Sequence, residues 1–463
     1  MKVEISNLGV IKKAEIDLKP LTVFIGQNGE GKSWTAYAIS AIFGGYSLRE
    51  YLKAYIEGKT QQKYPPLDEA IRQLMEEGNA KIDVVKFAEY YAEIYLNDVA
   101  RFAPKLMRNF MNSRHLSFKD LQVSLNLAES KTQLIEKIEA AFIEKKISLN
   151  PQTKTALLNA LKESKEANLY FYSSGNFLEK LPGRSVKEFV CQEVFQIVHK
   201  AFFTNTYFFP TERTTFISFP PGGAWEINGG TTESLPKGIA LTEPVKQLLE
   251  TIAIAYQENL VWREEQINNN PQIGEYLKLA EFLESEILLG KLKFETFIQK
   301  RLLFQPLEAD IALEMPVVSS MVKELAPLVL YLRYLAEPND LLIIDEPEIN
   351  LHPSVQVEIV EFLGMLVNAG LNVLITSHSP YIVDQLVNTM KAEKHEEKEK
   401  IKNLFYLESS EAFIPQELVS VYFFDEGNTH NILREDGTID WDTFNDVFED
   451  GIRLYSQLLT VEG

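Results

Sequence analysis

The sequence predicts an α/β fold in which a mixed β-sheet and a parallel core sheet are flanked by helices and interrupted by a large helical insertion. Three observations support this prediction. A short apolar strand at residues 21–25 enters a glycine-rich loop, and a helical segment follows at residues 34–43. Two apolar runs, residues 341–344 and 372–376, are separated by a helical segment, as buried parallel strands are. Residues 44–199 place apolar side chains mostly at helical spacing.

These patterns divide the 463 residues into one split domain and one insertion. Residues 1–43 and 200–463 form the split α/β domain, and residues 44–199 form a helical insertion domain. Residues 404–463 are a C-terminal α/β extension of the split domain. Within that extension, residues 419–424 and 429–433 are predicted to be a hairpin turned by Glu426-Gly427-Asn428. Pro220–Gly223 and Gly229-Gly230 indicate an irregular loop.

Composition limits the classes of protein that this chain can represent. The 46 basic and 66 acidic residues give a net charge of −20, which opposes general binding of DNA without excluding a local basic groove. Cys191 is the single cysteine, so no intrachain disulfide forms. Residues 1–10 lack the apolar core of a signal peptide, and no apolar run approaches the roughly 20 residues of a membrane helix. We expect a cytoplasmic protein with no membrane segment.

The glycine-rich loop, Gly26-Gln27-Asn28-Gly29-Glu30-Gly31-Lys32-Ser33, has the spacing G-x-x-x-x-G-K-[ST]. Its glycines let backbone N–H groups converge on a phosphate, and the helix that follows adds its positive N-terminal dipole. Lys32 reaches the β- and γ-phosphates of ATP, and Ser33 offers its hydroxyl to Mg²⁺. The predicted ATP-binding residues here are Gly26, Asn28, Gly29, Glu30, Gly31, Lys32, Ser33 and Trp34.

An acidic pair follows the strand at residues 341–344. Asp345 aims a carboxylate from the edge of the sheet toward the metal, which makes Ser33 and Asp345 the predicted magnesium ligands. Glu346 is placed to polarise the attacking water. An acidic turn with no catalytic role is the alternative interpretation, and the continuation into Pro347-Glu348 and Leu351-His352-Pro353 opposes it.

His378 ends the next strand, in Thr376-Ser377-His378-Ser379-Pro380. A lone histidine is more often structural than functional. Parallel strands end at one edge of the sheet, however, and ligands collect there, so we favour contact of His378 with the γ-phosphate.

These segments together resemble the ATP-binding-cassette (ABC) type of ATPase, in the branch shared by RecF, SMC-like and OLD (overcoming lysogenisation defect) proteins. The resemblance rests on residues 3–9 and 21–34, Asp345-Glu346-Pro347-Glu348 with Leu351-His352-Pro353, and residues 376–379. It implies an ATPase that uses ATP and Mg²⁺ and forms a homodimer, or a higher oligomer, with composite sites.

By that resemblance, residues 318–323 take the place of the family's signature motif, which covers the γ-phosphate held by the other subunit. Ser319 or Ser320 would supply the hydroxyl from a helix at residues 320–335. Met321 stands where the family usually has glycine, and a plain serine N-cap is the alternative. Arg213, in a segment that also resembles OLD proteins, faces the nucleotide or a partner, or forms a surface salt bridge.

The resemblance leaves two biological roles open. In one, the ATPase controls a separately encoded effector, a nuclease or a toxin, in anti-phage defence. In the other, it is a DNA-repair or chromosome-maintenance ATPase that binds DNA directly, which the net charge opposes. We expect no Toprim nuclease in this chain, because Asp425-Glu426-Gly427 and Asp440-Trp441-Asp442 lie too close together for an intervening βα unit. A transporter ATPase or a hexameric AAA+ motor would need features that the sequence does not display.

Overall fold

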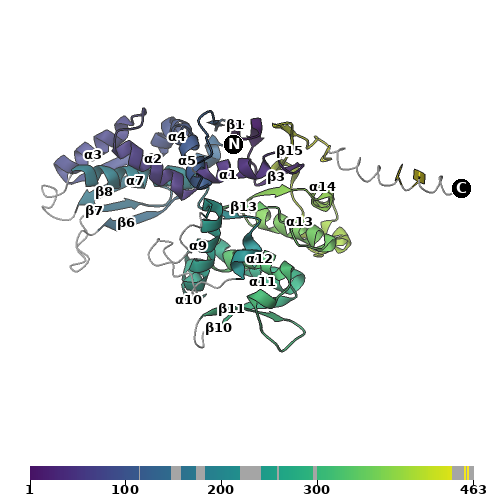
Figure 1. Ribbon diagram of the computed structural model, residues 1–463. Helices are drawn as coiled ribbons and strands as arrows, with labels where there is room; N and C mark the ends of the chain where they lie inside the picture. Colours follow the sequence, from purple (N-terminus) through teal and green to yellow (C-terminus); the bar gives the residue numbers. More distant parts are fainter. Residues whose placement is uncertain are drawn as a thin grey trace. The chain divides into compact units, whose positions relative to one another are not determined.

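The computed structural model in Figure 1 describes residues 1–113, 115–147, 158–173, 183–218, 241–257, 260–295, 300–440, 453–454 and 456–457. The loop predicted at Pro220–Gly223 and Gly229-Gly230 lies outside these residues. So do Trp441, Asp442 and most other residues after 440 in the predicted C-terminal extension. The described chain forms two compact units. Unit 1 contains residues 1–9, 37–206 and 339–341, and unit 2 contains residues 10–36, 207–338 and 342–463.

Unit 2 is built on a mixed sheet with the strand order β2-β16-β15-β3-β14-β13-β9. Strand β3 is buried along its whole length and pairs in parallel with β14 on one side and β15 on the other. A strand with neighbours and helices on all sides needs apolar residues throughout, which explains its continuous apolar run. The strands are β2 (Ile11–Asp17), β3 (Leu21–Gly26), β9 (Thr206–Phe209), β13 (Leu341–Asp345), β14 (Asn372–Ser377), β15 (Val419–Asp425) and β16 (Asn428–Asn431).

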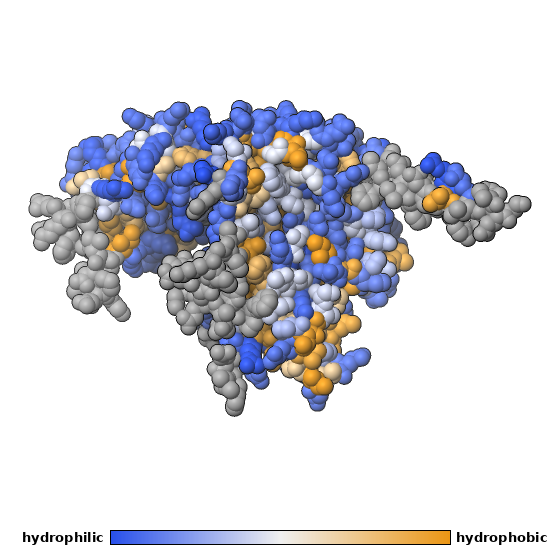
Figure 2. Space-filling view, in the orientation of Figure 1, coloured by the Kyte–Doolittle hydropathy of each residue, from blue (hydrophilic) through white to orange (hydrophobic). Residues whose placement is uncertain are grey.

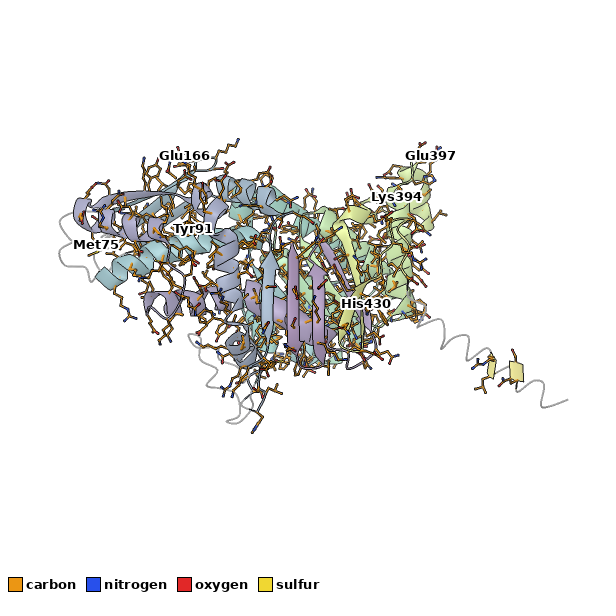
Figure 3. The ribbon with its side chains drawn as sticks, turned by 90° about the horizontal axis from the view of Figure 1, so that it is seen from above. Met75, Tyr91, Glu166, Lys394, Glu397 and His430 are labelled. Atoms are coloured by element: carbon orange, nitrogen blue, oxygen red, sulfur yellow. The ribbon has the colours of Figure 1, made fainter. Side chains whose placement is uncertain are left out.

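The predicted hairpin near the C-terminus is confirmed by β15 and β16, which pair in antiparallel fashion. Asp425 faces Asn428, so Glu426 and Gly427 form a two-residue turn, and both have positive φ angles, 47° and 81°. Two positive φ angles are what a type I′ hairpin turn requires. The label His430 marks β16 in Figure 3.

Helices pack against this sheet and form the buried core of unit 2. The predicted helix after Leu351-His352-Pro353 is α13, which begins at Pro353 because His352 caps it by accepting the Ser354 N–H. Ile359, Phe362, Leu363 and Leu366 on one face of α13 are buried, and Val355 on the same face is partly buried. The other helices are α8 (Arg213–Ile217), α9 (Glu243–Gln257), α10 (Leu260–Asn269), α11 (Gln272–Phe282), α12 (Ser320–Tyr334), α14 (Pro380–Glu393) and α15 (Lys398–Ile401), and α1 (Lys32–Phe43) begins in this unit. A three-stranded sheet of β10 (Gly290–Glu295), β11 (Arg301–Pro306) and β12 (Leu313–Glu314) completes it.

Unit 1 contains the whole range of the predicted insertion. Its helices are α2 (Gly45–Ile56), α3 (Pro65–Glu77), α4 (Val84–Ala100), α5 (Ala103–Phe110), α6 (Lys131–Ala140) and α7 (Gly183–Phe202). Tyr51, Tyr95 and Phe195 pack against one another in an aromatic core. Met75 on α3 and Tyr91 on α4 mark this unit in Figure 3.

The prediction of an insertion made of helices is incomplete. Strands β4 (Asn79–Asp83), β8 (Asn168–Ser173), β7 (Leu158–Lys162) and β6 (Ile143–Ile147) form an antiparallel sheet in that order, and β5 (Gln122–Asn126) pairs with β1 (Lys2–Leu8). These strands are short, and the pairings of β4 with β8 and of β1 with β5 cross long sequence separations, such as Asn79 with Tyr172, so local periodicity does not reveal them.

The surface in Figure 2 is mainly hydrophilic, with apolar residues in small groups, as is usual for globular domains. None of the described helices combines the length and apolar character that a membrane crossing requires.

Candidate functional site

The glycine-rich loop connects the end of β3 to the start of α1, as its sequence context predicts. Gly26 and Gly31 have φ angles of 144° and 88°, which residues with a side chain rarely adopt. A Cβ atom on Gly26 would lie 2.5 Å from the carbonyl oxygen of Phe424, and one on Gly31 would lie 2.7 Å from the Ile11 side chain. Only glycine therefore fits at these two positions.

Lys32 is folded back into this loop. Its Nζ donates to the carbonyl oxygens of Gly26 and Gln27, both at 2.9 Å, and the residue is 4% exposed. Burial lowers the pKa of Lys32 from 10.5 to about 8, although Glu346 and Asp345 favour the charged form. The two loop carbonyls are therefore the main hydrogen-bond partners of the Lys32 ammonium group.

Asp345 lies at the end of β13 and is 2% exposed. Its Oδ1 accepts hydrogen bonds from Ser33 Oγ at 2.8 Å and from Thr376 Oγ1 at 2.5 Å. Burial raises the pKa of the Asp345 carboxyl, and these two hydroxyl groups oppose that rise. Hydroxyl and carboxylate oxygens are hard ligands of the kind that Mg²⁺ prefers, so Ser33 and Asp345 could hold this ion together.

Glu346 and His378 face each other beside Lys32. His378 Nε2 lies 3.1 Å from Glu346 Oε1, and His378 Nδ1 lies 3.5 Å from Lys32 Nζ. Because an ammonium group only donates, Nδ1 is the acceptor and Nε2 carries the proton. The hydrogen bond from His378 holds the pKa of Glu346 below its usual value. Glu346 also has a positive φ of 49°, which turns its backbone sharply after the strand.

Glu348 is a member of this site to which sequence reasoning assigned no role. Its Oε1 accepts from the His378 backbone N–H at 2.6 Å and from Ser377 Oγ at 2.8 Å. Burial raises the pKa of the Glu348 carboxyl. Glu348 therefore fixes the end of β14 to the turn after β13, and so fixes where His378 stands. Its place in the run Asp345-Glu346-Pro347-Glu348 was the feature of the sequence that could have indicated a role at this site.

Residues 1–383 match the family model described as AAA ATPase domain. The chain belongs to the AAA ATPase domain family. No curated protein matches the sequence. Solved structures are also similar to it, and three SMC heads are among them. The SmcHead bound to the C-winged helix domain of ScpA has 10% identity and a TM-score of 0.37, with 93% of this chain and 96% of that chain covered.

Two further similar structures are also SMC heads. The SMC head domain from Thermotoga maritima has 10% identity and a TM-score of 0.30, with 93% of this chain and 97% of that chain covered. The Smc head domain with an extended coiled coil, bound to the C-terminal domain of ScpA derived from Pyrococcus furiosus, has 11% identity and a TM-score of 0.35, with 98% of each chain covered. The α/β fold class predicted from the sequence is confirmed in this AAA ATPase domain by its mixed sheet and flanking helices.

Burial of Arg213 in the AAA ATPase domain excludes two of its three predicted places, a surface salt bridge and contact with a partner, and its contact with the nucleotide stays a prediction. Arg213 is 2% exposed, so it forms no surface salt bridge and faces neither solvent nor a partner. Its Nη1 donates to the carbonyl oxygen of Asp345 at 2.7 Å, and its Nη2 donates to that of Glu346 at 2.8 Å. It also forms a buried ion pair with Glu324 of α12. The resemblance located this arginine, but burial of a charge cannot be read from one sequence.

Ser319 and Ser320 are exposed at the start of α12 in the AAA ATPase domain. Ser319 Oγ accepts from the Val322 N–H at 3.3 Å, which is the N-cap alternative considered above. Asn28 and Glu30 lie at the tip of the loop, and Trp34 is half-buried in α1. No observed contact tests the roles predicted for these five residues, which stay predictions.

Proposed function

We propose that this chain binds and hydrolyses ATP with Mg²⁺, as an ABC-type ATPase of the RecF, SMC and OLD-like branch. The observation that carries the proposal is the convergence of Lys32, Ser33, Asp345, Glu346 and His378 in unit 2. Ser33 and Asp345 are 312 residues apart in the sequence, yet they share a hydrogen bond of 2.8 Å. A purely structural role would not need a lysine, a hydroxyl, two carboxylates and an imidazole together.

The residues present fit both ATP and magnesium. A Cβ atom on Gly29 would meet nothing within 4 Å, so the loop is open there, and the backbone N–H groups of such a loop are suited to bind phosphate oxygens. Lys32 would exchange two loop carbonyls for the β- and γ-phosphates. Ser33 and Asp345 would hold Mg²⁺, which when bound neutralises charge on the phosphates.

Glu346 is the general base in this proposal. Its depressed pKa keeps the carboxylate ionised at neutral pH, so it is ready to accept a proton from the attacking water. His378 orients Glu346 through Nε2–H and, when turned toward the nucleotide, offers the same N–H to the γ-phosphate. Thr376 and Glu348 hold the two ends of this arrangement, through Asp345 and His378 respectively.

We further propose that two copies assemble around ATP and control a separately encoded effector, a nuclease or a toxin, in anti-phage defence. Exposure of Ser319 and Ser320 supports a role at a partner's site. The net charge of −20 favours this role over direct binding of DNA. A DNA-binding ATPase of this branch would be expected to have a long coiled coil, and no described helix is longer than the 20 residues of α7. A DNA-repair or chromosome-maintenance ATPase is the competing function.

ATP turnover, measured with and without double-stranded DNA at two salt concentrations, tests both functions. We expect magnesium-dependent turnover that Lys32→Ala abolishes and that Lys278→Ala, a surface change, leaves intact. Large salt-sensitive stimulation by DNA would favour the competing function. For the defence role, phage plating is measured on cells that carry this chain with the neighbouring reading frame, and protection should disappear with Lys32→Ala.

Lys32 also predicts how ATP affinity depends on pH. With its pKa at about 8, Lys32 is charged below that pH and increasingly neutral above it. A triphosphate favours the charged form, so binding above pH 8 must take up a proton, and affinity must fall as pH rises toward 10. Calorimetry of a non-hydrolysable ATP analogue in buffers of different ionisation enthalpy measures this uptake. Lys32→Arg, which stays charged, is the control that shows no uptake in this range.

A further inference from the structure

Arg213 joins two parts of unit 2 that the proposed function uses for different purposes. One is the turn at Asp345 and Glu346, where hydrolysis would occur. The other is α12, which begins at Ser320 and is capped by Ser319. The guanidinium group donates to the backbone carbonyls of that turn at 2.7 and 2.8 Å and pairs with Glu324 of α12.

The geometry around Arg213 leaves little freedom on either side. Nη1 also donates to the Pro210 carbonyl at 3.0 Å, which holds the arginine at the start of α8. The Glu346 N–H is held from the other direction by Thr376 Oγ1 at 3.0 Å. The turn is thus restrained through its N–H by β14 and through its carbonyls by Arg213.

Glu324 lies one helical turn beyond Ser320, so it follows any movement of the start of α12. Four residues of α-helix span only about 6 Å. Glu324 is 2% exposed, and burial raises its pKa to about 7. Breaking its pair with Arg213 would leave an uncompensated charge inside the protein, which is strongly unfavourable. The turn and the helix are therefore expected to move together rather than separately.

We propose that Arg213 and Glu324 are positioning residues that couple the nucleotide state at Asp345 and Glu346 to the placement of Ser319 and Ser320. This inference rests on the proposed function and adds the route by which one copy's hydrolytic site sets the surface it offers to another copy. Neither residue touches the reacting atoms. They act on the position of the start of α12, and therefore on when Ser319 and Ser320 are available to another copy.

A fluorescent reporter on Ser320→Cys tests this coupling. Cys191, the single native cysteine, is buried, and burial raises its thiol pKa to about 12, so labelling is selective. The dye signal is followed during addition of ATP and Mg²⁺ at a protein concentration where the chain is monomeric. We expect a nucleotide-dependent change that shrinks at least about fivefold in Glu324→Gln, with ATP affinity within about threefold of the parent.

A second variant guards against loss of folding. Arg213→Met/Glu324→Leu removes both charges and leaves no unpaired ion, and it should show the same loss of signal. Glu314→Gln, which breaks only an exposed ion pair with Arg301, should keep the full signal. A full signal in Glu324→Gln and in the double variant overturns the proposal, as does a parent that binds ATP without any change at Ser320. A parent that binds no ATP overturns the proposed function itself.

Discussion

Glu346→Gln is expected to slow ATP hydrolysis by about 10²–10⁴-fold, the usual contribution of a general base, while ATP binding survives. The amide keeps the shape of the side chain and can still accept the His378 Nε2–H, now 3.1 Å from the carboxylate. It cannot accept a proton from water. The phosphate-binding and magnesium-holding groups, Lys32, Ser33 and Asp345, are unchanged, so affinity should change little.

Single-turnover hydrolysis and binding of a fluorescent ATP analogue measure these two quantities separately. Because the bound ATP then persists, sedimentation should detect an ATP-dependent dimer of Glu346→Gln that the parent forms only transiently. Glu281→Gln, an exposed change on α11, is the matched control and should hydrolyse ATP at the parental rate. Unchanged turnover in Glu346→Gln would remove the assignment of Glu346 as base, whatever the state of the dimer.

The sequence is sufficient to bring the reacting groups together because of one topological fact. Parallel strands end at the same edge of a sheet, so groups that follow β3, β13 and β14 must meet there. Lys32, Asp345 and His378 each follow such a strand, and the structure places all three within one hydrogen-bonded cluster.

What the sequence did not predict is how those groups are held. Arg213 looks like a surface or interface residue, because arginine usually is one, yet it is buried against Glu324. Glu348 looks like one more acid in a loop, yet it fixes the His378 backbone. The place of Arg213 depends on burial and on a partner more than a hundred residues away in the sequence, and that of Glu348 on burial and on a partner about thirty residues away. A local sequence pattern contains neither kind of information.

A second buried ion pair, between Glu284 and Arg333, also could not be predicted from the local sequence. Its removal is expected to have a large effect on stability. Glu284, 2% exposed, accepts the Leu292 N–H through Oε1 at 2.6 Å and pairs through Oε2 with Arg333 of α12. Arg333 Nη1 in turn donates to the Leu292 carbonyl at 2.9 Å. Leu292 lies on β10, an edge strand whose outward N–H and C=O groups need partners. The ion pair therefore covers the edge of this sheet.

Glu284→Leu is expected to lower the free energy of unfolding of unit 2 by about 3–5 kcal/mol, because it leaves Arg333 without its counter-charge and Leu292 N–H without an acceptor. Denaturant unfolding followed by circular dichroism measures the loss. Glu275→Leu is the matched control on α11, and removal of its exposed pair with Lys278 should cost no more than about 0.5 kcal/mol. The double variant Glu284→Leu/Arg333→Leu should recover more than half of the loss, because no buried charge then lacks a partner. If Glu284→Leu cost no more than Glu275→Leu, the edge of β10 would be stabilised by its apolar packing and not by this ion pair.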